Sequence, residues 1–151
     1  MDFAFTAEAG LAGLFLASFL SATLLPGGSE AVLFAVIRQH PEQAMAALVL
    51  ATVGNTLGGM TTYGMGRLLP AQLPVVTGRS DSAPPKFAAS HAAMLRRWGP
   101  AALLLAWAPI IGDALCAAAG WLRLPPAACT LWMATGKAAR YALIVAGAGM
   151  L

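Results

Sequence analysis

The sequence predicts an all-α integral membrane protein, with two re-entrant helical hairpins in an inverted repeat, two full transmembrane helices and short interfacial helices. Its 151 residues are 59% hydrophobic and 10% charged, with a mean hydropathy of +0.73, whereas an ordinary soluble domain is about 25% charged. No charge occurs between Glu8 and Glu30 or between Glu42 and Arg67, and each gap accommodates the ~20 residues of a spanning helix. A soluble enzyme is therefore excluded, and the length predicts one domain, residues 1–151.

The first repeat, residues 1–66, begins with an apolar segment that is broken once. The segment covers residues 10–37 and its interruption lies at 26–30. The interruption consists of Pro26, Gly27, Gly28, Ser29 and Glu30. Because proline and consecutive glycines do not continue a regular helix, we expect the segment to enter the membrane and return, with Pro26, Gly27, Gly28 and Ser29 at the tip of the hairpin. Residues 44–66 then carry no charge and predict a full span.

Small residues recur at every fourth position of that span. They are Gly54, Gly58, Thr62 and Gly66. This spacing predicts a smooth ridge on one helix face, against which another backbone can pack closely. The ridge suits the chain's own hairpin as readily as a second copy, so a homo-oligomer stays open. Asn55 and Arg67 belong to a polar strip beside the ridge, and an amide at mid-span needs a polar partner.

Residues 67–97 form the hydrophilic part of the sequence. They contain four prolines and the basic residues Arg79, Lys86, Arg96 and Arg97. We expect a cytoplasmic loop followed by an interfacial helix at 86–97, because basic residues gather on the cytoplasmic side of membrane proteins. The basic residues then set the orientation of the protein in the membrane. Because their placement fits a loop better than a surface that reads bases, no nucleic-acid partner is expected.

The second repeat, residues 98–151, has the same order as the first. An apolar segment at 98–122 is broken at Pro109–Asp113, which includes Gly112, and a span at 124–151 follows. A proline precedes an acid by four residues in both halves, as Pro26 precedes Glu30. Paired broken segments are typical of transporter folds. They predict two hairpins that face each other from opposite surfaces. Four plain kinked spans are the alternative, because 98–122 is long enough to cross.

Four ionisable side chains are predicted at membrane depth: Glu30, Asp113, Lys137 and Arg140. An isolated charge there costs roughly 2.5–3.5 kcal/mol. One interpretation is a structural network of ion pairs. The other is a hydrated cavity for an anionic lipid headgroup, in which Arg140 binds phosphate oxygens and Lys137 adds a point charge, while an acid exchanges protons. We add Asn55 and Arg67 to these four as candidate residues for binding substrate or protons.

The sequence shows no set of residues for catalysis. It has no Ser/His/Asp trio, no phosphate-binding glycine loop and no spacing typical of metal ligands. Cys116 and Cys129 both lie in apolar runs and are expected in the core. We therefore expect no enzyme activity, no metal and no cofactor.

Four stretches together resemble the YqaA-type bacterial inner-membrane proteins of the DedA superfamily, also called SNARE-associated or VTT-domain proteins. They are FLSATLLPGGSEAVL (19–33), GNTLGGMTTYGMGRLLP (54–70), RRWGPAALLLAWAPIIGDALCAAAGWLR (96–123) and GKAARY (136–141). The resemblance implies two opposed re-entrant hairpins in a multi-pass protein of the bacterial inner membrane. In some members it implies transport of undecaprenyl phosphate or phospholipid, linked to the proton gradient.

By position, the resemblance assigns several residues to family motifs and shows where this chain departs from them. Pro26 and Glu30 match the first hairpin tip, Pro109 matches the second, and Gly120 matches the glycine that follows it. Tyr63, Gly66 and Arg67 match the motif at the end of the first span. Larger members carry acids where Ser21 and Gly59 stand here, and arginines where Trp107 and Asp113 stand.

These observations predict a transporter of a lipid or lipid-phosphate with proton coupling. Its expected partners are membrane lipids with an anionic headgroup or phosphate, and protons. Two other interpretations stay open. One is a proton-coupled transporter of a small solute or ion that uses the same cavity, and the other is a membrane scaffold in which the charges only hold the helices together.

Overall fold

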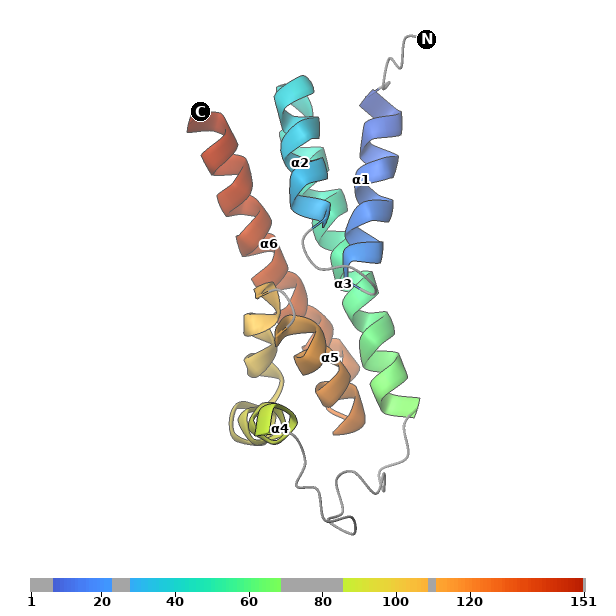
Figure 1. The fold of residues 1–151 in the computed structure, drawn as a ribbon, viewed down its shortest axis with the longest axis vertical. Coiled ribbons are helices and arrows are strands. Elements are labelled where there is room, and N and C mark those ends of the chain that lie inside the picture. The colour runs from blue at the N-terminus through green and yellow to red at the C-terminus, as the bar shows by residue number, and fades with distance from the viewer. Residues whose placement is uncertain (1–6, 23–27, 69–85, 109–110, 151) are drawn as a thin grey trace.

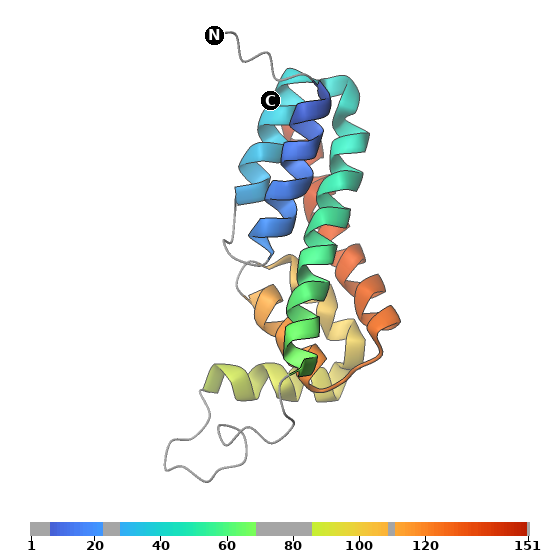
Figure 2. The same cartoon turned by 90° about the vertical axis from the view of Figure 1, so that its right-hand side faces the viewer.

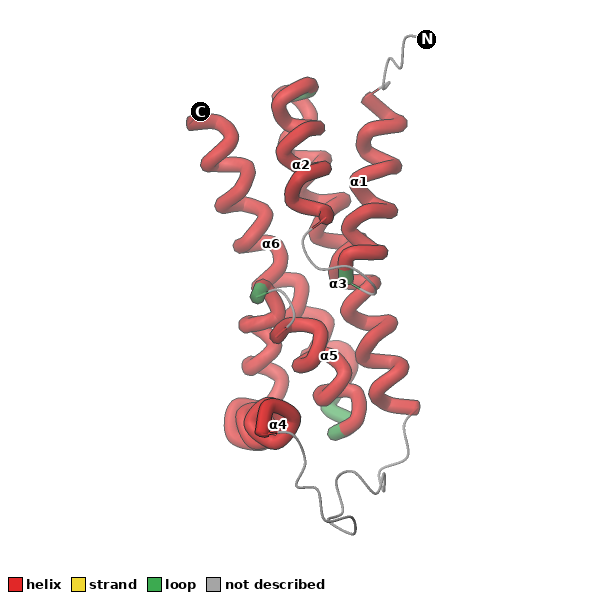
Figure 3. The backbone as a smooth tube through the Cα atoms, viewed as in Figure 1, coloured by secondary structure: helices red, strands yellow, loops and turns green. Residues whose placement is uncertain are grey.

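A computed structural model describes residues 7–22, 28–68, 86–108 and 111–150, all of them in helices or the short connections between helices (Figures 1 and 3). The elements are α1 (Ala7–Ser21), α2 (Gly28–Gln39), η1 (Pro41–Gln43), α3 (Ala44–Leu68), α4 (Lys86–Trp98), η2 (Gly99–Trp107), α5 (Ile111–Trp121) and α6 (Pro126–Met150). No strand occurs within these residues. The predicted all-helical class is therefore correct.

Helix ends follow the predicted breaks in both halves of the chain. Both second helices begin within the predicted interruptions at 26–30 and 109–113, α2 at Gly28 and α5 at Ile111. Gly28 and Ser29 are the first residues of α2, and Gly112 lies in the first turn of α5. The other predicted tip residues, Pro26, Gly27 and Pro109, lie outside the described residues.

Two long helices are each flanked by a pair of half-length helices. The long helices α3 and α6 have 25 residues each, and α1, α2, η2 and α5 have between 9 and 15. As Figures 1 and 2 show, α1 and α2 run antiparallel beside the upper half of α3. The helix α5 packs against the lower half of α3, and η2 runs antiparallel to α5 and packs against α6. The first helix of each pair, α1 or η2, approaches the middle of the molecule from the opposite end to the other. The helix α4 lies across the lower end.

One helix in the described part of the chain, Pro41–Leu68, is long and apolar enough to cross a membrane by itself, and Ala9–Ser21 is a shorter apolar helix. The helix α6 is as long as α3 but contains Lys137 and Arg140. Two apolar clusters hold the bundle together. One surrounds Leu14, Leu33 and Ala47 in the upper half, and the other joins α5 to η2, α3 and α6 in the lower half.

The small-residue ridge of α3 packs against both half-length pairs of the same chain. A Cβ atom added at Gly54 would lie 2.7 Å from the carbonyl oxygen of Phe15 in α1. At Gly58 it would lie 2.6 Å from a second α1 carbonyl. The Thr62 hydroxyl donates a hydrogen bond of 3.3 Å to the carbonyl of Ala22, and Gly66 touches the backbone of α5. The ridge is therefore covered by the chain's own helices.

The element η2 is a 3₁₀ helix of nine residues, where the sequence suggested only an apolar segment. Such helices seldom exceed one turn. Glycines of both neighbours let this narrow helix pack closely. A Cβ at Gly136 of α6 would overlap the Leu104 carbonyl oxygen, and one at Gly112 of α5 would overlap the Ala106 carbonyl oxygen. Backbone contact on two sides compensates for the weaker hydrogen bonds of a 3₁₀ helix.

The connection from α5 to α6 is a Schellman turn. The amide of Leu124 donates to the Ala119 carbonyl at 3.1 Å, and the amide of Arg123 donates to the Gly120 carbonyl at 2.9 Å. Arg123 has a φ of +55°. Glycine usually occupies this left-handed position, because the conformation costs other residues roughly 1–2 kcal/mol. An arginine here is therefore held against its backbone preference.

Candidate functional site: a buried polar network along α6

Arg140 of α6 joins the start of α2 to the end of η2. Its guanidinium forms an ion pair with the carboxylate of Glu30 in the first turn of α2. The same group donates a hydrogen bond of 2.9 Å to the carbonyl of Trp107, the last residue of η2. The Arg140 side chain is 17% exposed and that of Glu30 is 36% exposed. This pair is therefore only partly buried.

Lys137 lies one turn earlier on α6 and is almost completely buried. The residue is 3% exposed, and its Nζ donates a hydrogen bond of 2.6 Å to the backbone carbonyl of Asn55 in α3. An electrostatic attraction links it to Asp113 in the first turn of α5. Gly59 makes room for the ammonium, because a Cβ there would lie 2.9 Å from Nζ. The absence of a side chain at position 59 thus leaves the space that the Lys137 ammonium occupies.

A chain of hydrogen bonds connects the two charged pairs. The Asn55 amide donates to the Tyr141 hydroxyl at 2.6 Å, and that hydroxyl shares a hydrogen bond of 2.9 Å with the hydroxyl of Ser29. A longer contact of 3.5 Å joins the Asn55 amide to Ser21. Tyr141 is fully buried. Because Ser29 precedes Glu30, the network runs from Lys137 through these neutral groups to the Glu30–Arg140 pair.

The structure thus brings five of the six predicted binding residues into one network. They are Glu30, Asn55, Asp113, Lys137 and Arg140. Arg67 lies elsewhere, at the lower end of α3, where it donates a hydrogen bond of 2.8 Å to the Tyr63 hydroxyl. Sequence reasoning missed Tyr141. Its signal was its position four residues after Lys137, which places both side chains on one face of a helix.

The network contains two acidic and two basic side chains: Glu30 pairs with Arg140, and Asp113 lies within electrostatic range of Lys137. No group of three or more side chains suited to a metal ion occurs within the described residues. One cavity of about 480 Å³ lies between α1 and α2 and has mainly apolar walls, including Gly13, Val32 and Ala35. None of the five network residues lines it. A hydrated chamber around the charges therefore stays a prediction.

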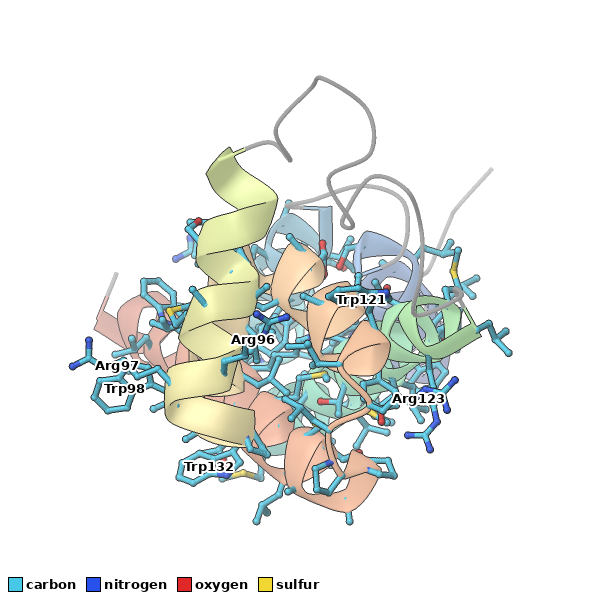
Figure 4. All side chains as sticks on the ribbon, turned by 90° about the horizontal axis from the view of Figure 1, so that it is seen from below. Arg96, Arg97, Trp98, Trp121, Arg123 and Trp132 are labelled. Atoms are coloured by element: carbon cyan, nitrogen blue, oxygen red, sulfur yellow. The ribbon has the colours of Figure 1, made fainter. Side chains whose placement is uncertain are left out.

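The lower end of the molecule carries arginine and tryptophan side chains, as Figure 4 shows. Arg96 and Arg97 come from the last turn of α4, and Arg123 comes from the turn before α6. Trp98 is 63% exposed and lies beside Arg97, whose guanidinium is 5.9 Å from the centre of the indole ring. Arginine and tryptophan together are typical of a membrane–water interface.

An apolar bundle of helices with an ion pair between half-length helices is typical of helical membrane proteins. Residues 25–149 match the family model of the VTT domain, and the chain therefore belongs to this family, which includes the DedA proteins. It is 39% identical over 136 residues to proteins named inner membrane protein YqaA from Escherichia coli (strain K12) and Shigella flexneri, covering 90% of this chain and 89% of each relative.

An uncharacterized protein of Haemophilus influenzae (strain ATCC 51907 / DSM 11121 / KW20 / Rd) is also similar. It is 39% identical over 140 residues, which cover 87% of this chain and 83% of the relative. No solved structure matches the chain. The predicted membership in the DedA superfamily is thus confirmed by the relatives and the family model together.

Proposed function

We propose that the chain is a multi-pass protein of the bacterial inner membrane that transports a lipid or lipid-phosphate with proton coupling. The observation that carries this proposal is the Glu30–Arg140 ion pair. It lies where α2 begins and η2 ends, and it is only partly buried. Family membership and the name of the E. coli relative support the location. Arginine binds phosphate through two parallel hydrogen bonds, which favours a phosphate-bearing substrate.

In this proposal the half-length elements are re-entrant hairpins. The longest of them, α1, has 15 residues and spans about 22 Å at 1.5 Å per residue, whereas the hydrocarbon core is about 30 Å thick. α3 and α6 reach about 37 Å and would cross it. Arg96, Arg97 and Arg123 then share the cytoplasmic side, as the positive-inside rule requires, and the 67–97 segment is cytoplasmic.

The transport step we propose exchanges one anion for another at Arg140. An arriving lipid phosphate replaces Glu30 as the partner of the guanidinium, and the released carboxylate takes up a proton. Lys137 keeps its bond to the Asn55 carbonyl and its attraction to Asp113, so the second hairpin stays neutralised during the exchange. One proton and one anionic headgroup would thus bind together, which couples lipid movement to the proton gradient.

Reconstitution in vesicles tests this proposal. Labelled anionic phospholipid should cross the bilayer faster when a pH gradient is imposed. Arg140→Gln should abolish that movement at normal insertion levels, whereas Arg97→Gln on the exposed side of α4 should leave it intact. If Arg140→Gln is fully active, the headgroup site is wrong. If the variant disappears from the membrane, the charges serve as a scaffold. If it loses uptake of a small ion and lipid never moved, the solute alternative holds.

Cysteine accessibility tests the re-entrant second hairpin separately. Cysteines placed at Arg96 and Arg123 should react with an impermeant maleimide from the same side of the membrane, because a segment that enters and returns keeps both ends on one face. Reaction from opposite sides would establish that 98–122 crosses the bilayer and that the four-span alternative is correct.

A further inference from the structure

A corner at the lower end of the molecule joins the end of α3 to the turn between α5 and α6. The Tyr63 hydroxyl donates a hydrogen bond of 2.6 Å to the carbonyl of Leu124 and accepts one of 2.8 Å from Arg67. Gly120 touches the α3 backbone so closely that a Cβ there would overlap the Tyr63 carbonyl. Arg123 directly precedes Leu124, and Figure 4 shows it beside the end of α3. Two guanidinium groups therefore belong to this corner.

The backbone gives no reason for an arginine at position 123. Its φ of +55° is one that glycine adopts without cost, and the turn uses only its amide. The side chain itself is exposed, as is that of Arg67. Residues held in unfavourable backbone conformations cluster at functional sites. We therefore take the exposed guanidinium, and not the backbone, as the reason for an arginine at position 123.

Three carboxylates of the described helices interact elsewhere. Glu42 contacts His40 at 3.3 Å at η1, Glu30 pairs with Arg140, and Asp113 lies within electrostatic range of Lys137. Within the described residues the corner thus gathers positive charge next to a phenol that is already oriented by two hydrogen bonds. An exposed pair of guanidinium forks is suited to the oxygens of a phosphate diester.

We propose that Arg67, oriented by Tyr63, and Arg123, in the turn that Tyr63 holds through Leu124, bind the phosphate of an anionic phospholipid from the leaflet that borders the lower end of the molecule. This site is separate from the Glu30–Arg140 pair, and its occupancy does not depend on transport. Arg67 thereby gains a role outside the α6 network, and Arg123 a role beyond orienting the protein in the membrane.

Thermal unfolding of the full chain in a neutral detergent tests the site. Phosphatidylglycerol should raise the midpoint, since a ligand that binds only the folded state stabilises it, whereas phosphatidylcholine and inorganic phosphate should not. Without lipid, Arg123→Gly should raise the midpoint by roughly 2–4 °C, because glycine removes the left-handed strain. The same variant should lose most of the shift that phosphatidylglycerol causes in the original protein.

Arg97→Gln is the matched control, because it removes an arginine from the same end of the molecule but outside the corner. It should keep the full phosphatidylglycerol shift. The site is refuted if Arg123→Gly keeps that shift, or if both variants lose it equally, which would indicate general surface charge. A shift with inorganic phosphate alone would overturn the lipid assignment. Arg140→Gln should abolish transport yet keep the shift, so the two proposals fail independently.

Discussion

Replacing Gly66 by alanine tests the contact between α3 and α5 directly. An added Cβ would overlap the carbonyl oxygen of Ala117. Because that oxygen belongs to a helix backbone, no side-chain rotation relieves the overlap, and the helices must separate. Gly64, two residues earlier in α3, has nothing within 4 Å of the same added atom. The pair Gly66→Ala and Gly64→Ala therefore differs in packing but shares the same chemical change.

The expected magnitude follows from two opposing contributions. Alanine favours a helix over glycine by about 0.8–1.0 kcal/mol, and this gain is common to both variants. Overpacking at Gly66 costs about 1–3 kcal/mol. The difference between the two variants is therefore about 1–3 kcal/mol in the free energy of unfolding, which corresponds to roughly 2–12 °C in the midpoint. Gly64→Ala should be at least as stable as the original protein.

The assay is thermal unfolding of the purified protein in mild detergent, followed by tryptophan fluorescence. Gel filtration before heating shows whether each variant is folded and of the same size. Equal midpoints for Gly66→Ala and Gly64→Ala would refute the close backbone contact between α3 and α5, and with it the conclusion that the ridge packs within the chain.

Two further substitutions probe the network along α6. Tyr141→Phe removes the acceptor of the Asn55 amide and should lower the free energy of unfolding by about 1–3 kcal/mol, because a buried donor is left unpaired; a thermal midpoint equal to the original would contradict the hydrogen bond. Gly59→Ala places a Cβ 2.8 Å from the sulfur of the buried Met133 and 2.9 Å from the Lys137 ammonium. It should lower the free energy of unfolding by about 1–3 kcal/mol through overpacking and slow lipid transport in vesicles, and unaltered transport would show that the position of Lys137 is not required.

Helix ends were accessible to prediction because local chemistry determines them. The helix predicted at 44–66 is found as Ala44–Leu68, and the helix predicted at 86–97 is found as Lys86–Trp98. In both halves the predicted interruption separates two helices. The 3₁₀ form of η2 was not predictable, because an apolar run such as GPAALLLAW carries no local signal for it. Its geometry depends on Gly112 and Gly136, which come from neighbouring helices.

The site was predicted as a set of charges but not as a set of contacts. Because an isolated charge at membrane depth is costly, the sequence indicated that Glu30 and Asp113 need cationic partners. Both lie near basic residues of α6. The choice of partner depends on packing between residues far apart in sequence, as between Asn55 and Lys137. Tyr141 was missed for the same reason, since a tyrosine in an apolar helix does not reveal which buried amide it meets.

The helix α6 carries Arg140, the partner of Glu30 in α2, and Lys137, which attracts Asp113 in α5, three residues apart. A translation of this helix by one residue moves it about 1.5 Å along its axis. It would disturb the Glu30 pair and the attraction to Asp113 at the same time. A shift of α6 therefore changes the charge partners of α2 and α5 together.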